Sequence, residues 1–367
     1  MKKRIFSIVI VLCMVLTFVP TTVFAANETD YNLWVGGTHV TSSTLSGERW
    51  AFDPGTYTLT LRSDFASSDT ANLQDSTDHA AVIYYAASDH SLTIKLEGDA
   101  AIGAAGWENA LTSSSKYLYG IYALSSDITI TGSHTLDVYG SEDAIWCRSL
   151  TVDGTKLNCR SYYTAVKVCS SAKSYFSDSM NGEADMVVKN GAAVFARTTH
   201  GTGIHPTTSG NADFWSRFRD CGGGAGIFVN GSLRVENSTV DAENTCYELP
   251  APVTDTWGYN TGCKNGTFCT SICVHDDVVV SGSAARVTGK LENLAEDFER
   301  TGTEDTWYSK RGAVMAKNFK VREGGTIEGF ITNDHFTQVA QGLRQLHWFT
   351  RSLGLHKLLS ARFFGNR

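Results

Sequence analysis

The sequence predicts an all-β protein: a right-handed parallel β-helix of about seven coils with an N-terminal strand cap and a short helical C-terminal tail. Three observations lead to this fold class. Short alternating apolar runs separated by Gly, Asn, Ser and Asp dominate the chain, which has only 5 prolines but 34 glycines. Amphipathic helical patterns are absent before residue 335. The alternating runs also repeat with one layout, which distinguishes a solenoid from an antiparallel sandwich.

One copy of the repeat, over residues 226–242, shows this layout. Its apolar positions form three pairs joined by brief turns: Ile227 and Val229, Leu233 and Val235, then Val240 and Ala242. Further copies begin at Val82, Ile121, Ile145, Val166, Ile272 and Val314. Three short strands with two inward side chains each suit one coil of a parallel β-helix, and stacking the coils buries those side chains in a continuous core.

The first 25 residues predict a secretory signal peptide. Lys2, Lys3 and Arg4 precede an apolar run from Ile5 to Val19, and Val23-Phe24-Ala25 supplies a cleavage site. The run is too short for an ordinary membrane span, and no later stretch is apolar enough to be one. The predicted location is therefore extracellular, either secreted or associated with a cell surface, with no transmembrane segment after cleavage.

The remainder divides by composition. Residues 26–79 are expected to form the strand cap, with short strands around the turn at Asp53, and residues 80–334 the β-helix with inserted loops. Residues 335–367 form a basic amphipathic tail. Three interpretations of this tail remain open: a cap helix, a membrane-surface helix, or a terminus foreign to the protein.

The charge of the chain argues against two classes of partner. The whole chain carries 31 basic and 38 acidic residues, and residues 26–334 carry 23 and 38, a net charge of −15. Such a body repels nucleic acid and anionic membranes. No nucleic-acid partner is therefore expected, and the oligomeric state is not indicated.

Long insertions fall at one corner of the repeat, at residues 104–118, 197–223, 244–270 and 296–311. Because coils stack, loops at one corner stack as well and often form the binding face. The predicted substrate-binding residues are the aromatic side chains of these loops: Trp107, Trp215, Trp257, Trp307, Tyr259 and Tyr308. Such rings can stack on the apolar face of a sugar, or they can fold inward and pin the loops to the solenoid wall.

A second group of mostly apolar residues is expected to point outward, between the two inward residues of each first strand. They are Ile83, Tyr122, Trp146, Lys167, Phe228, Cys273 and Met315. An outward apolar stripe is either covered by the inserted loops or forms a contact surface.

Eight cysteines follow the signal segment, and an exported chain permits disulfides between them. Cys246 and Cys263, in one long insertion, are the disulfide candidates; free thiols and a metal site are the alternatives. Cys147 and Cys159 occupy inward positions of the repeat and are expected to be small core residues.

No catalytic residue can be assigned. The chain lacks a Gly-x-Ser-x-Gly elbow and a His-Glu-x-x-His motif, and no acidic pair is distinguished from the many present. Whether the protein is an enzyme stays open, with a non-catalytic role preferred. No cofactor is expected, with calcium as the one candidate ion, and no metal ligand can be named.

The segments from Tyr31 to Ser42 (YNLWVGGTHVTS) and from Phe52 to Leu61 (FDPGTYTLTL) resemble the opening of secreted surface proteins of clostridia-like bacteria, which are similar to the β-helical carbohydrate-binding domain family. The likeness spans roughly 31–330, and the tail departs from it. It implies an extracellular solenoid that binds polysaccharide, of acidic or plant cell-wall type, with calcium as the candidate ion.

Three functions follow as hypotheses. The leading one is a non-catalytic polysaccharide-binding or adhesive solenoid. The alternatives are a polysaccharide lyase or glycoside hydrolase built on a β-helix, and a structural surface protein that contacts other proteins.

Overall fold

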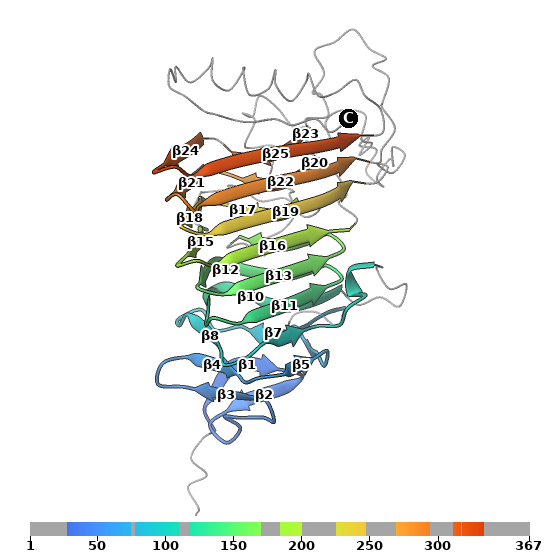
Figure 1. The fold of residues 1–367 in the computed structure, drawn as a ribbon. Helices are drawn as coiled ribbons and strands as arrows, with labels where there is room; N and C mark the ends of the chain where they lie inside the picture. The colour runs from blue at the N-terminus through green and yellow to red at the C-terminus, as the bar shows by residue number, and fades with distance from the viewer. Residues whose placement is uncertain are drawn as a thin grey trace, which may run out of the picture.

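The computed structural model describes residues 28–74, 78–109, 117–169, 184–199, 225–246, 269–293, 311–316 and 318–333. This part of the chain is nearly all β-structure, with one short 3₁₀-helix, η1 (Trp107–Asn109), and no α-helix. The strands form a 17-stranded sheet A and an 8-stranded sheet B. In Figure 1 the strands of sheet B stack one above another from the N-terminal to the C-terminal end of the molecule. Sheets of parallel strands stacked in this way are compatible with the predicted β-solenoid.

Three kinds of strand alternate along the chain. First strands, in sheet A, are β7 (His79–Tyr85), β14 (Thr164–Val168), β17 (Ala225–Val229), β20 (Cys269–Val274) and β23 (Arg311–Met315). Second strands, also in sheet A, are β8 (Leu92–Leu96), β15 (Met186–Lys189), β18 (Leu233–Glu236), β21 (Asp277–Ser281) and β24 (Asn318–Arg322). The long strands β10 (Tyr117–Thr131) and β12 (Asp143–Asp153) serve as first and second strand together.

Third strands make up sheet B, and each pairs in parallel with the next. They are β5 (Phe65–Ser67), β9 (Ala100–Ile102), β11 (Thr135–Gly140), β13 (Lys156–Ser161), β16 (Ala193–Thr198), β19 (Thr239–Cys246), β22 (Arg286–Asn293) and β25 (Thr326–Asn333). Because side chains alternate along every strand, one face of each sheet points into the core and the other face points outward.

The core lies between the sheets and is formed by the inward positions that the repeat predicts. Ile121, Ile145, Val166 and Ile227 are successive partners across the first strands, and all are fully buried. Cys147 and Cys159 are also fully buried, as predicted for small core residues. Burying one Val, Leu or Ile side chain contributes about 1.5–3 kcal/mol, so these rows are the main source of stability.

Near the ends of two third strands, β16 and β19, a buried polar side chain is hydrogen-bonded to the first strand that follows. Thr198 donates its hydroxyl to the carbonyl oxygen of Ala225 at 3.0 Å, and Asn244 donates its amide to that of Thr270 at 2.8 Å. A buried hydroxyl or amide without a hydrogen bond lowers the stability of the fold, so these contacts allow Thr198 and Asn244 to be buried there. Two of the predicted long insertions begin near these strand ends.

The N-terminal end is closed by two antiparallel hairpins. One joins β1 (Asp30–Val35) to β2 (Thr38–Thr41), and the other joins β3 (Trp50–Asp53) to β4 (Thr58–Leu61) through the predicted turn at Asp53. A short strand, β6 (Ala71–Asn72), pairs with β7. The parallel ladder already starts inside the range expected to be the cap, because β4 pairs with β8 and β5 with β9.

Two details differ from the sequence prediction. The repeat copy expected to begin at Val82 is shifted, because Ile83 pairs with the inward Ile121 and is fully buried in the core. The strands also extend into the predicted insertions, since β19 continues to Cys246 and β10 already starts at Tyr117. The predicted tail, 335–367, and the signal segment, 1–25, lie outside the described residues. Among the residues described, no helix has the length and apolar character needed to cross a membrane.

Candidate functional site

Most of the predicted loop aromatics cannot be compared with the structure. Trp215, Trp257, Tyr259, Trp307 and Tyr308 lie outside the described residues and stay predictions. The disulfide candidates are in the same position: Cys263 is outside the described residues, and for Cys246 only the backbone, at the end of β19, is described.

Trp107 is the one predicted loop aromatic that the structure places. It begins η1, is partly buried and packs against the core. A side-chain carbon added at Gly103 would lie 3.2 Å from its ring, so the indole covers the backbone at that glycine. This position shows that Trp107 packs against the core, as the packing interpretation expects, and its role in sugar binding stays a prediction.

A continuous row of outward residues crosses the first strands of sheet A, and we call it the outer row. Each member is the backbone partner of the next across nine neighbouring strands. In order, the outer row consists of His39, Trp34, Tyr84, Tyr122, Trp146, Lys167, Phe228, Cys273 and Met315. Its first two members come from the N-terminal hairpin, which pairs antiparallel with β7 and so extends the sheet.

Compared with the predicted stripe, the outer row contains Tyr84 in place of Ile83 and two further residues, Trp34 and His39. Ile83 was expected to point outward but lies in the core, and its neighbour Tyr84 takes the outward place. Trp34 was missed because it belongs to the antiparallel hairpin rather than to a copy of the repeat. The repeated dipeptides Ile83-Tyr84, Ile121-Tyr122 and Ile145-Trp146, aligned with one another, carry the signal that identifies Tyr84.

The rings of the N-terminal half of the outer row contact one another in sequence. Trp34 stacks on His39 with ring centroids 4.4 Å apart and on Tyr84 at 4.9 Å. Tyr122 follows at 6.0 Å from Tyr84, and Trp146 at 5.4 Å from Tyr122. The last two contacts are tilted by 59° and 72°, so the ring planes change direction along the row.

Exposure divides the outer row into two halves. In the N-terminal half, Trp34, Tyr122 and Trp146 are partly exposed. In the C-terminal half, Lys167, Phe228 and Cys273 are buried, with relative exposures of 7%, 4% and 0%. Met315, at the end of this half, is partly exposed, whereas Tyr84 in the N-terminal half is buried. Cover by the inserted loops stays a prediction, and the partly exposed rings of Trp34, Tyr122 and Trp146 are accessible to a ligand.

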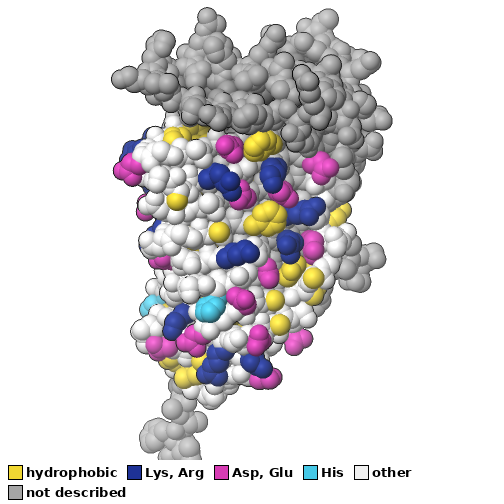
Figure 2. All heavy atoms as spheres, viewed as in Figure 1, with side chains coloured by type: hydrophobic (Ala, Val, Ile, Leu, Met, Phe, Trp, Pro, Cys, Tyr) yellow, Lys and Arg dark blue, Asp and Glu magenta, His cyan; other side chains and the backbone are white. Residues whose placement is uncertain are grey.

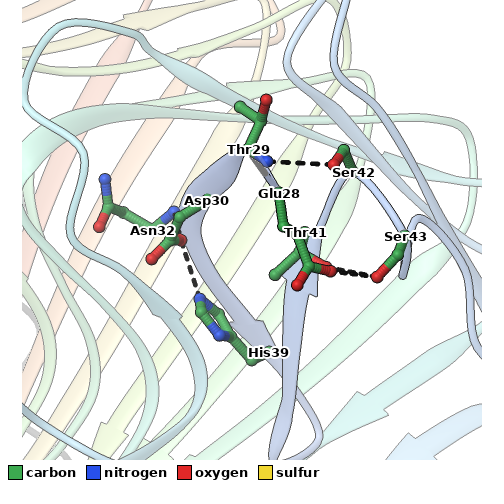
Figure 3. Close-up of polar contacts among 8 residues, drawn as sticks. All are labelled: Glu28, Thr29, Asp30, Asn32, His39, Thr41, Ser42 and Ser43. Carbon is green, nitrogen blue, oxygen red and sulfur yellow. Dashed lines mark hydrogen bonds and ion pairs between the residues drawn. The ribbon is translucent and has the colours of Figure 1, made fainter. Parts of the chain in front are cut away.

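Polar contacts in the N-terminal hairpin fix the start of the row (Figure 3). The His39 ring lies 2.8 Å from a carboxylate oxygen of Asp30, which also accepts the backbone N–H of Asn32. The carboxylate of Glu28 accepts hydrogen bonds from the hydroxyls of Thr41 and Ser43. The bonds of Glu28 join the segment just before β1 to the end of β2 and lower the pKa of Glu28, and together with the Asp30 contacts they hold the hairpin that carries Trp34 and His39.

A shorter aromatic group lies beside the row, at the corner where β10 begins. Tyr117, 39% exposed, stacks on His79 with centroids 4.7 Å apart. Tyr119, two residues further along β10, is 1% exposed, and its hydroxyl lies 3.0 Å from the His79 ring. Burial lowers the pKa of His79, so its ring is neutral at neutral pH.

A buried ionisable cluster lies at the centre of the outer row. The Lys167 ammonium lies 3.6 Å from a carboxylate oxygen of Asp143 and 3.7 Å from the centroid of the Trp146 ring. The side chains of Lys167 and Asp143 are 9% and 0% exposed. Burial raises the pKa of Asp143 and, together with repulsion from Asp143, that of the adjacent Glu142. A substrate cannot reach a fully buried carboxyl group, so Asp143 is not placed to exchange a proton with a bound substrate.

The outer face of sheet B is of a different kind, as Figure 2 shows: Lys and Arg side chains are intermixed with Asp and Glu. The Arg286 guanidinium lies 3.2 Å from Asp241, and the Lys290 ammonium 2.9 Å from Glu243. Arg160 donates to the Tyr139 hydroxyl at 3.1 Å on the neighbouring strands. These side chains pair with one another in solvent and leave no concentrated charge for a ligand.

The described part of the chain offers little for a metal. No group of three or more His, Cys, Asp or Glu side chains is placed to hold an ion among the residues described. The cysteines whose state is described, at positions 147, 159, 169 and 273, are free thiols. Burial raises the pKa of Cys147 and Cys159, which disfavours the thiolate that a metal requires. The prediction of calcium finds no support in these residues and stays a prediction.

Comparison with known proteins adds no relative: no family model, curated protein or solved structure matches this chain.

Proposed function

We propose that the protein is a secreted or cell-surface, non-catalytic β-solenoid that binds polysaccharide on the N-terminal half of the outer row. The observation that carries the proposal is the line of partly exposed rings formed by Trp34, Tyr122 and Trp146, with Tyr84 between the first two. The surface lies on strands rather than on loops, so its rings are held in fixed positions.

The chemistry of a sugar fits such a line. A pyranose presents an apolar C–H face that packs on an aromatic ring, and its hydroxyls hydrogen-bond to nearby polar groups. Tyr122 offers a phenol beside the rings, and Asp30, His39 and Asn32 offer polar atoms at the end of the row. Because the ring planes turn along the row, the site suits a chain whose sugar faces also turn from one residue to the next.

The finer description of the fold belongs to the same proposal. We infer that the successive first, second and third strands are coils of a right-handed parallel β-helix, about seven in number, because a parallel crossover is almost always right-handed. Signal-peptide cleavage near residue 25 and export would bring this solenoid outside the cell, where polysaccharide is encountered.

The test is retention of the purified protein in gels containing neutral or acidic polysaccharides, with calcium or with a chelator. We expect selective retention on one class of polysaccharide. Retention that is lost with the chelator would assign an ion between acidic residues and an acidic sugar. Absence of retention on every polysaccharide would overturn the proposal, and binding to a protein instead would support the structural alternative. Release of unsaturated or reducing ends would support the lyase or hydrolase alternative.

A further inference from the structure

The buried cluster of Asp143, Lys167 and Glu142 brings together the parts of an amide-forming reaction. Lys167 on β14 and Asp143 on β12 come from neighbouring strands, and the ammonium nitrogen lies 3.6 Å from a carboxylate oxygen. The Asp143 residue is fully buried, and Lys167 is 7% exposed. Side-chain ion pairs between neighbouring strands are common in this protein, but the others are much more exposed to solvent.

The surroundings favour the neutral forms of the two carboxylic acids, Asp143 and Glu142. The carboxylate of Asp143 is fully buried, with Lys167 and Thr164 as its polar neighbours, and the buried Oε2 of Glu142 has no hydrogen-bond partner among the described residues. The Trp146 ring lies against the Lys167 ammonium, a cation–π contact that holds this side chain beside Asp143. Burial raises the pKa of both acids, so a proton is more easily held on the carboxyl groups here than in water. Transfer of one proton from the ammonium to Asp143 converts the ion pair into an amine beside a carboxylic acid.

We propose that Lys167 and Asp143 condense to form an intramolecular amide cross-link, with Glu142 as the group that moves the proton. The Nζ lone pair attacks Cγ of the protonated Asp143, forming the C–N bond. One oxygen of Glu142 accepts a proton from Nζ while the other delivers its proton to the departing hydroxyl. The C–O bond breaks and one molecule of water leaves, so the reaction needs no oxidant and no cofactor.

The cross-link would join two adjacent first strands at the centre of the outer row. It would tie β12 to β14 at the residue before Val168, the last residue of β14. A covalent bond between parallel neighbours restricts the unfolded chain and stabilises the folded one, as a disulfide does, but it does not depend on the redox state of the surroundings.

A matched control is present in the same part of the molecule. Lys189 and Asp153 also come from neighbouring strands, β15 and β12, and their charged atoms are 3.5 Å apart. Their side chains are 37% and 30% exposed, and water can keep both charged. If proximity alone were sufficient, this pair would react as well; the proposal requires that it does not.

The experiment is mass spectrometry of the purified full-length chain and of its proteolytic peptides. The unmodified protein is expected to be lighter by one water molecule than its sequence requires, and one branched peptide is expected to join Lys167 to Asp143. The control pair Lys189 and Asp153 should appear in separate, linear peptides. A folded protein of full mass, with Lys167 in a linear peptide, would overturn the proposal.

Two variants test the assigned roles. Lys167→Arg keeps the positive charge but cannot form the amide, so its full mass is expected. Glu142→Gln keeps the shape of the side chain but cannot move the proton, and the cross-linked fraction should fall from nearly all to a small part of the protein. An unchanged cross-linked fraction in Glu142→Gln would remove Glu142 from the reaction. Circular dichroism of both variants verifies that they fold, and the mass of the unmodified protein decides the central point in any case.

Discussion

The outer faces of sheet A and sheet B are built on the same succession of strands but carry different chemistry. On sheet A, the outer row is aromatic in its N-terminal half and buried at Lys167, Phe228 and Cys273 in its C-terminal half. On sheet B, the outward positions carry exposed pairs such as Arg286 with Asp241. Both faces lie over the same core, with equally buried inward rows such as Ile121 and Leu136.

This difference shows which positions the fold leaves free. Inward residues must be apolar and of suitable volume, because they fill the space between the sheets. Outward residues on a parallel strand have no such constraint, and a charged, solvated face such as that of sheet B meets the need for solubility. Solubility does not explain a face of aromatic rings and buried charges, and the proposals of ligand binding and of a cross-link would account for it.

The largest expected difference between the two outer faces follows from replacing one phenylalanine on each of them. Phe228, on the outer row, is 4% exposed, whereas Phe195, outward on sheet B, is partly exposed. Phe228→Ala should lower the free energy of unfolding by about 3–5 kcal/mol, as for other buried aromatic residues. Phe195→Ala should cost about 1 kcal/mol or less. Urea denaturation measures both, and equal costs would show that the two faces do not differ in burial.

A second prediction concerns pH. The pKa of Glu142 is raised by burial and by Asp143, and lowered to a smaller extent by Lys167, so the folded chain binds a proton more tightly than the unfolded one. Its stabilising effect is complete below the ordinary pKa of 4.5 and is lost as pH rises toward the raised value. Glu142→Gln should remove this loss.

The measurement compares Lys167→Arg with Lys167→Arg/Glu142→Gln, so that neither protein can form the amide. Between about pH 5 and pH 9, the single variant should lose more of its free energy of unfolding than the double variant. Glu97→Gln, at an exposed carboxylate paired with Lys95, serves as the control and should leave the pH profile unchanged. Identical profiles for the single and double variants would contradict the burial of the Glu142 charge.

The smallest expected effect is on sheet B. Lys290→Ala removes an ion pair whose two side chains are 53% and 29% exposed. The free energy of unfolding should fall by about 0.5 kcal/mol or less, and salt should remove most of that difference. Thermal unfolding at low and high salt measures it, and a salt-independent loss above about 1 kcal/mol would show that this face does more than remain solvated.

Alternation along short strands was sufficient to predict the core. Ile145, Cys147 and Leu150 were expected inward from their spacing, and all are buried to 1% exposure or less. The one-residue error at Ile83 has a physical cause: β7 contains the continuous apolar run Val82 to Tyr85, in which alternation gives no indication of which residues point inward.

The candidate site was less accessible to sequence reasoning. Trp34 joins the outer row only because an antiparallel hairpin pairs with β7, and the repeat pattern does not predict the register of that pairing. The contact between Asp143 and Lys167 depends on the register between β12 and β14 in the same way. Sequence reasoning placed Tyr122 and Trp146 on the outer stripe but assigned ligand binding to the loops instead.

The most direct test of the account is to compare affinities after changing two rings on each face. Trp34→Ala/Tyr122→Ala alters the N-terminal half of the outer row without touching the ionisable cluster, and Tyr139→Ala/Phe195→Ala alters sheet B equally. With the polysaccharide that retains the unmodified protein, we expect the first variant to bind at least about tenfold more weakly, since a central aromatic contact contributes about 1–2 kcal/mol or more. The second should bind as the unmodified protein does. Equal affinities for the two folded variants would contradict the assignment of the binding surface to sheet A.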